Sequence, residues 1–245
     1  MRKLSAPELL EIWERGSAQS ATERALTLLA AARPDLKSEA LGQLSIGRRD
    51  RLLLSLRETT FGRRLAAITN CPDCREQLDL AFDVADVRLP DMPAACDQAA
   101  TIAIAEYEVR FRLPDSFDLT MAAATGDPDL ARDLLLKRCL LSARREGQQI
   151  EIDQLPAAVM VRVEQEMLEL DAQANIQLDL HCPSCQRGWI ATFDILAFFW
   201  SELDAWAQRL LVQVHKLASA YGWSEADILG MSQVRRNLYL NIVNG

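Results

Sequence analysis

The sequence predicts an α+β fold in which helical N- and C-terminal segments surround a small β-rich body. Apolar residues recur at helical spacing in the first 64 and the last 50 residues, but alternate residue by residue at several places between them. Two identical Cys-Pro-x-Cys units, Cys71–Cys74 and Cys182–Cys185, each adjoin an alternating stretch. The segment between the units carries both periodicities, so we expect an α/β insertion there.

Capping signals define the first helices. Ser5–Glu8 and Ser20–Glu23 are both Ser-x-x-Glu capping boxes, and each precedes an apolar helical pattern. Gly16 can end the first helix, and Pro34 limits the second. A third helix is expected from Ser45 to about Thr59. We assign residues 1–64 to a helical N-terminal segment.

Period-two patterns dominate the next part of the chain, residues 65–195, which we assign to the β-rich body with an inserted strand and helix segment at 86–175. The patterns predict strands near 78–84, 102–104, 107–113, 150–152, 176–180 and 189–193. Helical patterns predict helices near 117–124, 128–143 and 156–171.

The C-terminal segment, 196–245, reads as helical. An apolar stripe runs from Leu203 to Tyr221, and Gly222 can end that helix. Ser224 and Ser232 are expected to cap a short helix and a last helix. The longest apolar run, Ile195–Trp200, is too short to span a bilayer, and no targeting signal is evident, so we expect a reducing cytoplasm.

Composition excludes extreme classes and shows an uneven charge. The chain has 245 residues, 49% of them hydrophobic and 25% charged, unlike a disordered or low-complexity protein. Its net charge is −8, but the first 64 residues hold 12 basic and 8 acidic side chains. The basic excess is centred on Arg48, Arg49 and Arg51, which form either a solvated helix face or a docking patch for an acidic protein surface. Nucleic acid is a weaker reading, because no aromatic residues are interleaved with these arginines.

The paired cysteines predict a structural metal site. Cys71, Cys74, Cys182 and Cys185 supply one full set of thiolate ligands, which suits one tetrahedral Zn²⁺ per chain in a zinc ribbon. The 107 residues between the units exceed the usual ribbon spacing, but closing a longer loop costs little extra free energy. Two units that bind no metal, or different metals, are the alternative; a redox pair does not explain the duplication.

The remaining cysteines and the two histidines are not expected to be part of the metal site. Cys96 and Cys139 lie outside the pattern and are expected in the core. His181 could replace a thiolate ligand, and His215 reads as a packing or interface residue. The sequence has no phosphate-binding glycine loop, no His-Glu-x-x-His and no Gly-x-Ser-x-Gly, so we expect no catalytic site.

Three stretches resemble a known family. They run from Ile46 to Cys74, from Leu113 to Cys139, and from Cys182 to Leu240, and include Leu113-Pro114-Asp115-Ser116-Phe117-Asp118-Leu119, Leu136-Lys137-Arg138-Cys139 and Tyr221-Gly222-Trp223-Ser224-Glu225. On these residues the chain resembles the zinc-ribbon baseplate proteins of T-even-type contractile phage tails, in the branch found with phage-tail-like extracellular contractile injection systems.

The resemblance implies a non-enzymatic part of a contractile tail, acting in baseplate or hub assembly. Its expected partners are other tail proteins, not a small-molecule substrate, nucleic acid or a membrane. It would assemble in the bacterial cytoplasm, and either stay in a released or virion-like particle or leave as a chaperone. Aromatic residues and arginines are typical interface anchors. The candidate interface is Arg48, Arg49, Arg51, Trp200, Trp206, Trp223, Arg235, Arg236 and Tyr239.

Two alternatives remain from the residues alone. A zinc-ribbon regulator would use residues 224–243 as a helix-turn-helix, with Arg235 and Arg236 on DNA. Two arginines on an acidic chain would make few contacts with DNA phosphates, which counts against a DNA-binding regulator. A metal-dependent enzyme is the second alternative, and a site closed by four thiolates counts against that.

Overall fold

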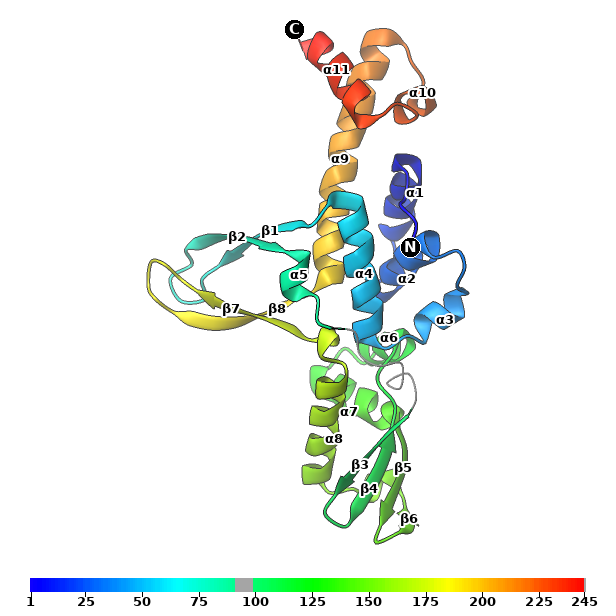
Figure 1. Cartoon of the computed structure of the whole chain (residues 1–245), viewed down its shortest axis with the longest axis vertical. Coiled ribbons are helices and arrows are strands. Elements are labelled where there is room, and N and C mark those ends of the chain that lie inside the picture. The colour runs from blue at the N-terminus through cyan, green and yellow to red at the C-terminus, as the bar shows by residue number, and fades with distance from the viewer. Residues whose placement is uncertain (91–98, 245) are drawn as a thin grey trace.

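The computed structural model describes residues 1–90 and 99–244, so Cys96 lies outside the described part of the chain. Figure 1 shows a branched molecule built on one long helix, α9 (Ile195–Tyr221). Short helices pack beside its lower half, two β-hairpins project to one side as an arm, and an α/β insertion lies at the far end. The C-terminal helices cover the other end of α9.

The N-terminal segment consists of α1 (Ala6–Gly16), α2 (Ala21–Ala32), α3 (Ser38–Gly42) and α4 (Ile46–Phe61). Both predicted capping boxes form: the backbone N–H groups of Ser5 and Ser20 donate to Glu8 and Glu23 at 2.8 Å. α4 begins directly after Ser45, close to the predicted start, and the Ser45 side chain caps it. The five-residue α3 was not predicted, because it is too short to show a helical period.

The arm consists of two antiparallel hairpins from opposite halves of the chain. One pairs β1 (Arg64–Asn70) with β2 (Gln77–Asp83), and the other pairs β7 (Ile176–His181) with β8 (Gly188–Phe193). Alternate residues of β2, β7 and β8 are half-buried, which confirms the predicted one-sided strands. At the base of the arm, Phe82 meets Phe193 edge-on at 5.6 Å. Strand β1 was not predicted, because its alanines give no alternating pattern.

The insertion follows α5 (Val84–Val87) and contains a four-stranded antiparallel sheet. Its strands are β3 (Ala100–Ile104), β4 (Tyr107–Phe111), β5 (Leu140–Arg145) and β6 (Gln148–Ile150), in that order. Its helices are α6 (Ser116–Ala123), α7 (Pro128–Cys139) and α8 (Ala157–Leu170), with 3-10 turns η2 (Ile152–Gln154) and η3 (Ala172–Ala174). The sheet, α7 and α8 share a separate core.

Two boundaries in the insertion differ from the prediction. The helix expected over 128–143 ends at Cys139, and residues 140–145 form β5. Ala143 is 1% exposed and pairs with Val109, so burial against β4 overrides the helix propensity of the leucines there. Ile152, expected in a strand, begins a 3-10 turn instead.

The C-terminal segment adds α10 (Glu225–Leu229) and α11 (Gln233–Asn244), both packed on α9. Gly222 ends α9 with a left-handed φ of 69°, which favours glycine, as predicted. Ser224 and Ser232 cap the two helices. Across residues 1–90 and 99–244, no helix has both the length and the apolar character needed to cross a bilayer.

The largest core lies among α1, α2, α4 and α9, at the root of the arm. It includes Leu53, Leu54, Phe199 and Leu203, all fully buried, together with Leu65 at the start of β1. Because Leu65 is buried here and the rest of β1 lies outside this core, the arm is anchored only at its base. The position of its tip therefore depends on contacts between the hairpins.

Candidate metal centre and the contacts that position it

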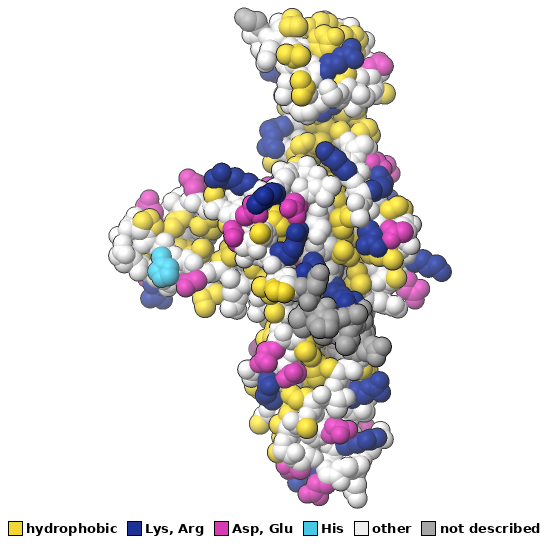
Figure 2. All heavy atoms as spheres, viewed as in Figure 1, with side chains coloured by type: hydrophobic (Ala, Val, Ile, Leu, Met, Phe, Trp, Pro, Cys, Tyr) yellow, Lys and Arg dark blue, Asp and Glu magenta, His cyan; other side chains and the backbone are white. Residues whose placement is uncertain are grey.

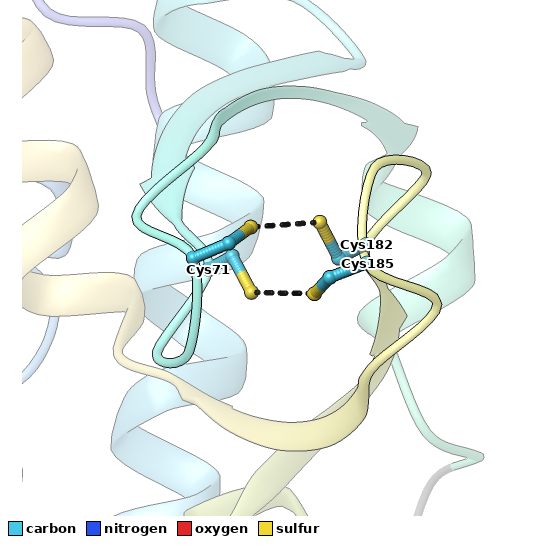
Figure 3. Close-up of side chains that lie close together, drawn as sticks. Cys71, Cys182 and Cys185 are labelled. Atoms are coloured by element: carbon cyan, nitrogen blue, oxygen red, sulfur yellow. Dashed lines mark hydrogen bonds between the residues drawn. The ribbon is translucent and has the colours of Figure 1, made fainter.

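The four cysteines of the two Cys-Pro-x-Cys units meet at the tip of the arm (Figure 3). The Sγ atoms of Cys71 and Cys185 lie 3.6 Å apart, as do those of Cys74 and Cys182, and the four sulfurs are within 4.8 Å of one another. Sulfurs at the corners of a tetrahedron with ~2.3 Å metal bonds would be about 3.8 Å apart. The thiols therefore have the spacing that a single tetrahedral ion requires.

The two turns that carry these cysteines have the same backbone geometry. Cys71 N–H donates to Glu76 O and Arg75 N–H to Cys71 O; Cys182 N–H donates to Arg187 O and Gln186 N–H to Cys182 O. The fourth residue after each first cysteine, Arg75 or Gln186, has a left-handed φ near 60°. In each turn the first cysteine is buried and the second is exposed. Each turn thus presents two thiols on one side, toward the other hairpin.

The thiols influence one another's protonation. Hydrogen bonds from the backbone of Cys74 and Asp73 lower the pKa of Cys71 to about 7. A backbone hydrogen bond at Glu76 lowers the pKa of Cys74, but burial and the neighbouring thiols outweigh it and raise that pKa to about 12. One thiolate therefore forms readily, and further negative charge needs a cation among the sulfurs. A soft divalent metal ion bound among the sulfurs would supply that charge.

His181 lies beside this cluster but is not needed to complete it. Its side chain is 70% exposed and lies over Gly188, its partner in the β7–β8 pair. The cluster of potential metal ligands found among the described residues consists of the four cysteines. Cys139 is fully buried in the insertion, as expected, and burial raises the pKa of its thiol to about 12.

A buried ion pair holds the root of the arm. The Arg57 side chain in α4 is 2% exposed, and its Nη2 and Nε donate to the Glu202 carboxylate in α9 at 2.5 and 2.7 Å. Its Nη1 donates to Gly62 O at 2.7 Å, in the turn that leads into β1. One arginine thus joins α4, α9 and the first hairpin. Sequence reasoning missed this role, although both residues lie in stretches that carry the family resemblance.

A second polar contact joins the insertion to α4. The Asp171 carboxylate, at the end of α8, accepts from Gly47 N–H at 2.8 Å and from Ser45 Oγ at 3.2 Å. A Cβ on Gly47 would lie 2.1 Å from Asp171 Oδ1, so only glycine permits this approach. Burial raises the pKa of Asp171, although the positive end of α4 favours its charged form.

A third contact lies inside the insertion and joins two parts of the second resembling stretch. Asp118 is fully buried and accepts from Arg112 Nη1 at 2.5 Å and from Arg138 Nε at 2.8 Å. Burial raises the pKa of Asp118, but Arg112 and the backbone N–H of Asp115 lower it to about 2 overall. The network fixes α6 against the end of α7. No sequence pattern would have identified this network, because the two arginines lie 6 and 20 residues from Asp118.

The candidate interface residues are spread over the molecule and differ in exposure. Arg49 and Arg236 are buried, at 5% and 4%, and Arg49 pairs with Asp50. Trp200 and Trp206 are half-buried against the largest core. Arg48 and Arg51, on α4, are half-buried. Trp223, Arg235 and Tyr239 do come together, with Trp223 and Tyr239 rings 4.8 Å apart and Arg235 over Tyr239 at 5.7 Å.

The environment of Trp200 predicts a cost for adding one methyl group to Gly16. A Cβ there would lie 2.1 Å from Cη2 of Trp200, and the guanidinium of Arg24 lies over the same ring at 4.6 Å. We expect Gly16→Ala to lower the free energy of unfolding by about 1–3 kcal/mol, because the Trp200 ring would have to shift away from the new methyl group. Urea denaturation measures this. Gly230→Ala is the control: that residue is helical, its closest contact is 3.2 Å, and we expect a change below about 0.5 kcal/mol.

Comparison with known proteins agrees with this architecture. The family model described as "T4 bacteriophage base plate protein" matches residues 8–200, which include all four cysteines, the insertion and the first turns of α9. Searches of curated proteins and of solved structures found no match. The matched range covers most of the chain, including both cysteine turns and the contact between Asp171 and Gly47, and ends two residues before Glu202. The chain therefore belongs to the T4 bacteriophage base plate protein family.

Proposed function

We propose that this chain is a non-enzymatic structural or assembly component of the baseplate of a contractile tail or injection system. The family match over residues 8–200 carries the proposal. The branched shape supports it, because an arm, an insertion and a helical end give one chain three separate surfaces for neighbouring subunits (Figure 1). We propose that the chain divides into segments 1–64, 65–195 and 196–245. We also propose that it joins its partner proteins in the bacterial cytoplasm.

We further propose that one Zn²⁺ per chain binds Cys71, Cys74, Cys182 and Cys185 and completes a zinc ribbon. The sulfur spacing of the two matching turns supports this. Four thiolates would fill a tetrahedral shell and leave no position for water or substrate, so the site would be structural. The ion would join two hairpins separated by the whole insertion, and would set the direction of the arm.

The C-terminal end supplies the best-defined surface for a partner subunit. Val234, Leu238 and Ile242 are 60–70% exposed and lie four residues apart, on one face of α11. Beside them, Tyr221 and Trp223 stack at 4.4 Å, and Arg235 adjoins Tyr239. Figure 2 shows hydrophobic side chains gathered at this end of the molecule. Aromatic, aliphatic and arginine side chains in this combination are typical of interface centres.

The C-terminal helices also argue against the DNA-binding alternative. It requires both Arg235 and Arg236 on the phosphate backbone, but Arg236 is 4% exposed and donates to Met231 O and Gln233 Oε1. α10 and α11 pack against α9. A single exposed arginine gives too little phosphate contact for sequence-tolerant binding.

Deleting the gene tests the proposed function. We expect no contractile particles by electron microscopy, although immunoblots still detect sheath and tube proteins, because the baseplate is the platform for their assembly. Complementation with the wild-type gene should restore particles, and Leu238→Glu should not. Leu130→Glu, at an equally exposed leucine on α7, should restore them. Normal particles in the deletion strain would refute the proposal. Mass spectrometry of purified particles separates a resident subunit from an assembly chaperone.

A further inference from the structure

A pocket of about 440 Å³ opens where α1, the end of α4, α9 and the start of α11 meet. Its walls combine an apolar floor, which includes Leu4, Phe61 and Leu210, with a basic rim of Lys3, Arg209 and Arg236. None of the described residues that line it is acidic. This concentration of positive charge stands out on a chain with a net charge of −8.

Arg236 is the feature that points to a ligand. It is 4% exposed, and its two terminal nitrogens donate to Met231 O and Gln233 Oε1, which are both uncharged acceptors. Its Nε–H is buried without a hydrogen-bond partner among the described residues, and Gln213 Oε1 in the same pocket is also unpartnered. A buried guanidinium without a carboxylate is unfavourable, and an unsatisfied buried donor adds to that cost.

The backbone strengthens the positive potential of the pocket. The first residues of two helices line it, Ala6 of the 11-residue α1 and Gln233 of the 12-residue α11. The positive ends of these helix dipoles therefore face the pocket. The last turn of α4, with Thr60 and Phe61, presents a negative end, but two helix N-termini and three cations outnumber it. The Glu8 carboxylate caps the N-terminus of α1 and is bonded to Arg2 at 2.7 Å, so the positive potential of the pocket comes mainly from α11 and the three cations.

We propose that this pocket binds a carboxylate that adjoins an apolar side chain, in an acidic and hydrophobic segment of a partner protein. Arg236, Arg209 and Lys3 would hold the carboxylate, and the half-buried rings of Phe61 and Trp206 would contact the apolar group. The Gln213 amide can rotate to offer its NH₂ group to the same anion. The apolar floor favours this ligand over free phosphate, which would leave that surface uncovered. The inference rests on the proposed function only for the statement that the partner is a tail protein.

Binding of short peptides to the full-length protein tests the pocket directly. The probes are Ac-Glu-Leu-Glu-Leu-Glu-NH₂, the same peptide with glutamine in place of glutamate, and inorganic phosphate. Calorimetry at low ionic strength should detect the glutamate peptide and show binding at least tenfold weaker for the glutamine peptide, since only the first carries charge. In ¹⁵N spectra the Arg236 Nε–H resonance should shift with the glutamate peptide, because that donor gains an acceptor.

Charge-removing variants locate the binding. Lys3 and Arg209 are both exposed, so Lys3→Gln with Arg209→Gln should keep the fold and weaken glutamate-peptide binding at least about tenfold. Arg110→Gln with Arg144→Gln removes the same charge from the exposed face of the insertion, and should change affinity less than about twofold. Arg236→Lys keeps the charge but lacks Nε, and should also weaken binding.

Three results would overturn the proposal. Equal affinity for the glutamate and glutamine peptides would exclude carboxylate recognition. Phosphate binding that matches the glutamate peptide and shifts the Arg236 resonance equally would assign the pocket to free phosphate. No glutamate-peptide binding at concentrations up to about 5 mM would exclude the ligand class, since weak specific recognition lies at or below this range. Because these measurements use purified protein, their failure is distinct from an absence of phenotype in the deletion strain.

Discussion

Cys74→Ala is expected to remove the metal from the protein and to release the tip of the arm. Loss of one of four thiolates should lower zinc affinity by more than about 100-fold, because loss of a supporting contact behind a ligand already costs 10–100-fold. Purified wild-type protein should contain about one zinc ion per chain, measured by elemental mass spectrometry, and the variant should contain almost none. Cys74 is exposed, so its replacement removes a ligand without opening a core cavity.

The structural consequence should be local. Each hairpin has only two strands, which are marginal alone. At the tip, the four thiols and an exposed ion pair between Asp73 and Arg187 at 3.7 Å join the two hairpins, so losing the metal removes the main link there. Amide hydrogen exchange should therefore lose protection in β1, β2, β7 and β8, while α4 and the fully buried part of α9 keep theirs. A chelator should give the same pattern in the wild-type protein. Acidification should also release the ion, because metal binding requires deprotonated thiols.

Cys139→Ala is the matched control. Its thiol is buried in the insertion, far along the chain from both turns, and it lies outside the four-cysteine cluster. We expect a loss of about 1 kcal/mol in the free energy of unfolding and an unchanged zinc content. A wild-type protein that contains no zinc and has a protected arm would contradict the proposed site. So would a Cys74→Ala variant that retains a full equivalent of metal.

The sequence predicted those parts of the fold that local patterns determine. Capping boxes at Ser5 and Ser20, the helix start near Ser45, the stop at Gly222 and the alternating β2, β7 and β8 were all confirmed. Each rests on residues fewer than about eight positions apart, so no knowledge of the fold is needed. The approach of the four cysteines was also predictable, because thiolate pairs with a shared spacing imply one ion.

The parts that were not predicted depend on partners distant in the sequence. β1 forms because β2 pairs with it, and β5 replaces the end of a helix because Ala143 is buried against Val109. Arg236 reads as an exposed basic residue of α11, but the pocket beside α9 buries it. The exposure of an arginine depends on which helices meet around it, and a helical period alone does not carry that information.

Glu202→Ala is expected to be among the most destabilising single substitutions in this chain. Glu202 is the carboxylate that neutralises Arg57, whose side chain is 2% exposed, and removing it leaves that buried guanidinium without a carboxylate. Breaking one side of a fully buried ion pair typically costs about 3–5 kcal/mol. Because the Glu202 side chain is itself 27% exposed, we expect a loss near the lower end of this range in the free energy of unfolding, measured by urea denaturation of the metal-loaded protein. The root of the arm should loosen as well, because Arg57 also holds Gly62 O.

Two controls separate burial from charge. Glu58→Ala breaks a 2.7 Å ion pair with Arg88, but both side chains are about one-third exposed, so the expected loss is at most about 1 kcal/mol. The double variant Arg57→Met with Glu202→Leu removes both charges together, and should recover most of the stability lost in Glu202→Ala, because no charge is then left unpaired. If Glu58→Ala and Glu202→Ala cost the same, the pair at the root of the arm is not a buried one. The double variant contains no unpaired charge at this place. If it is nevertheless as unstable as Glu202→Ala, the stability lost in Glu202→Ala comes from packing or from the Gly62 contact.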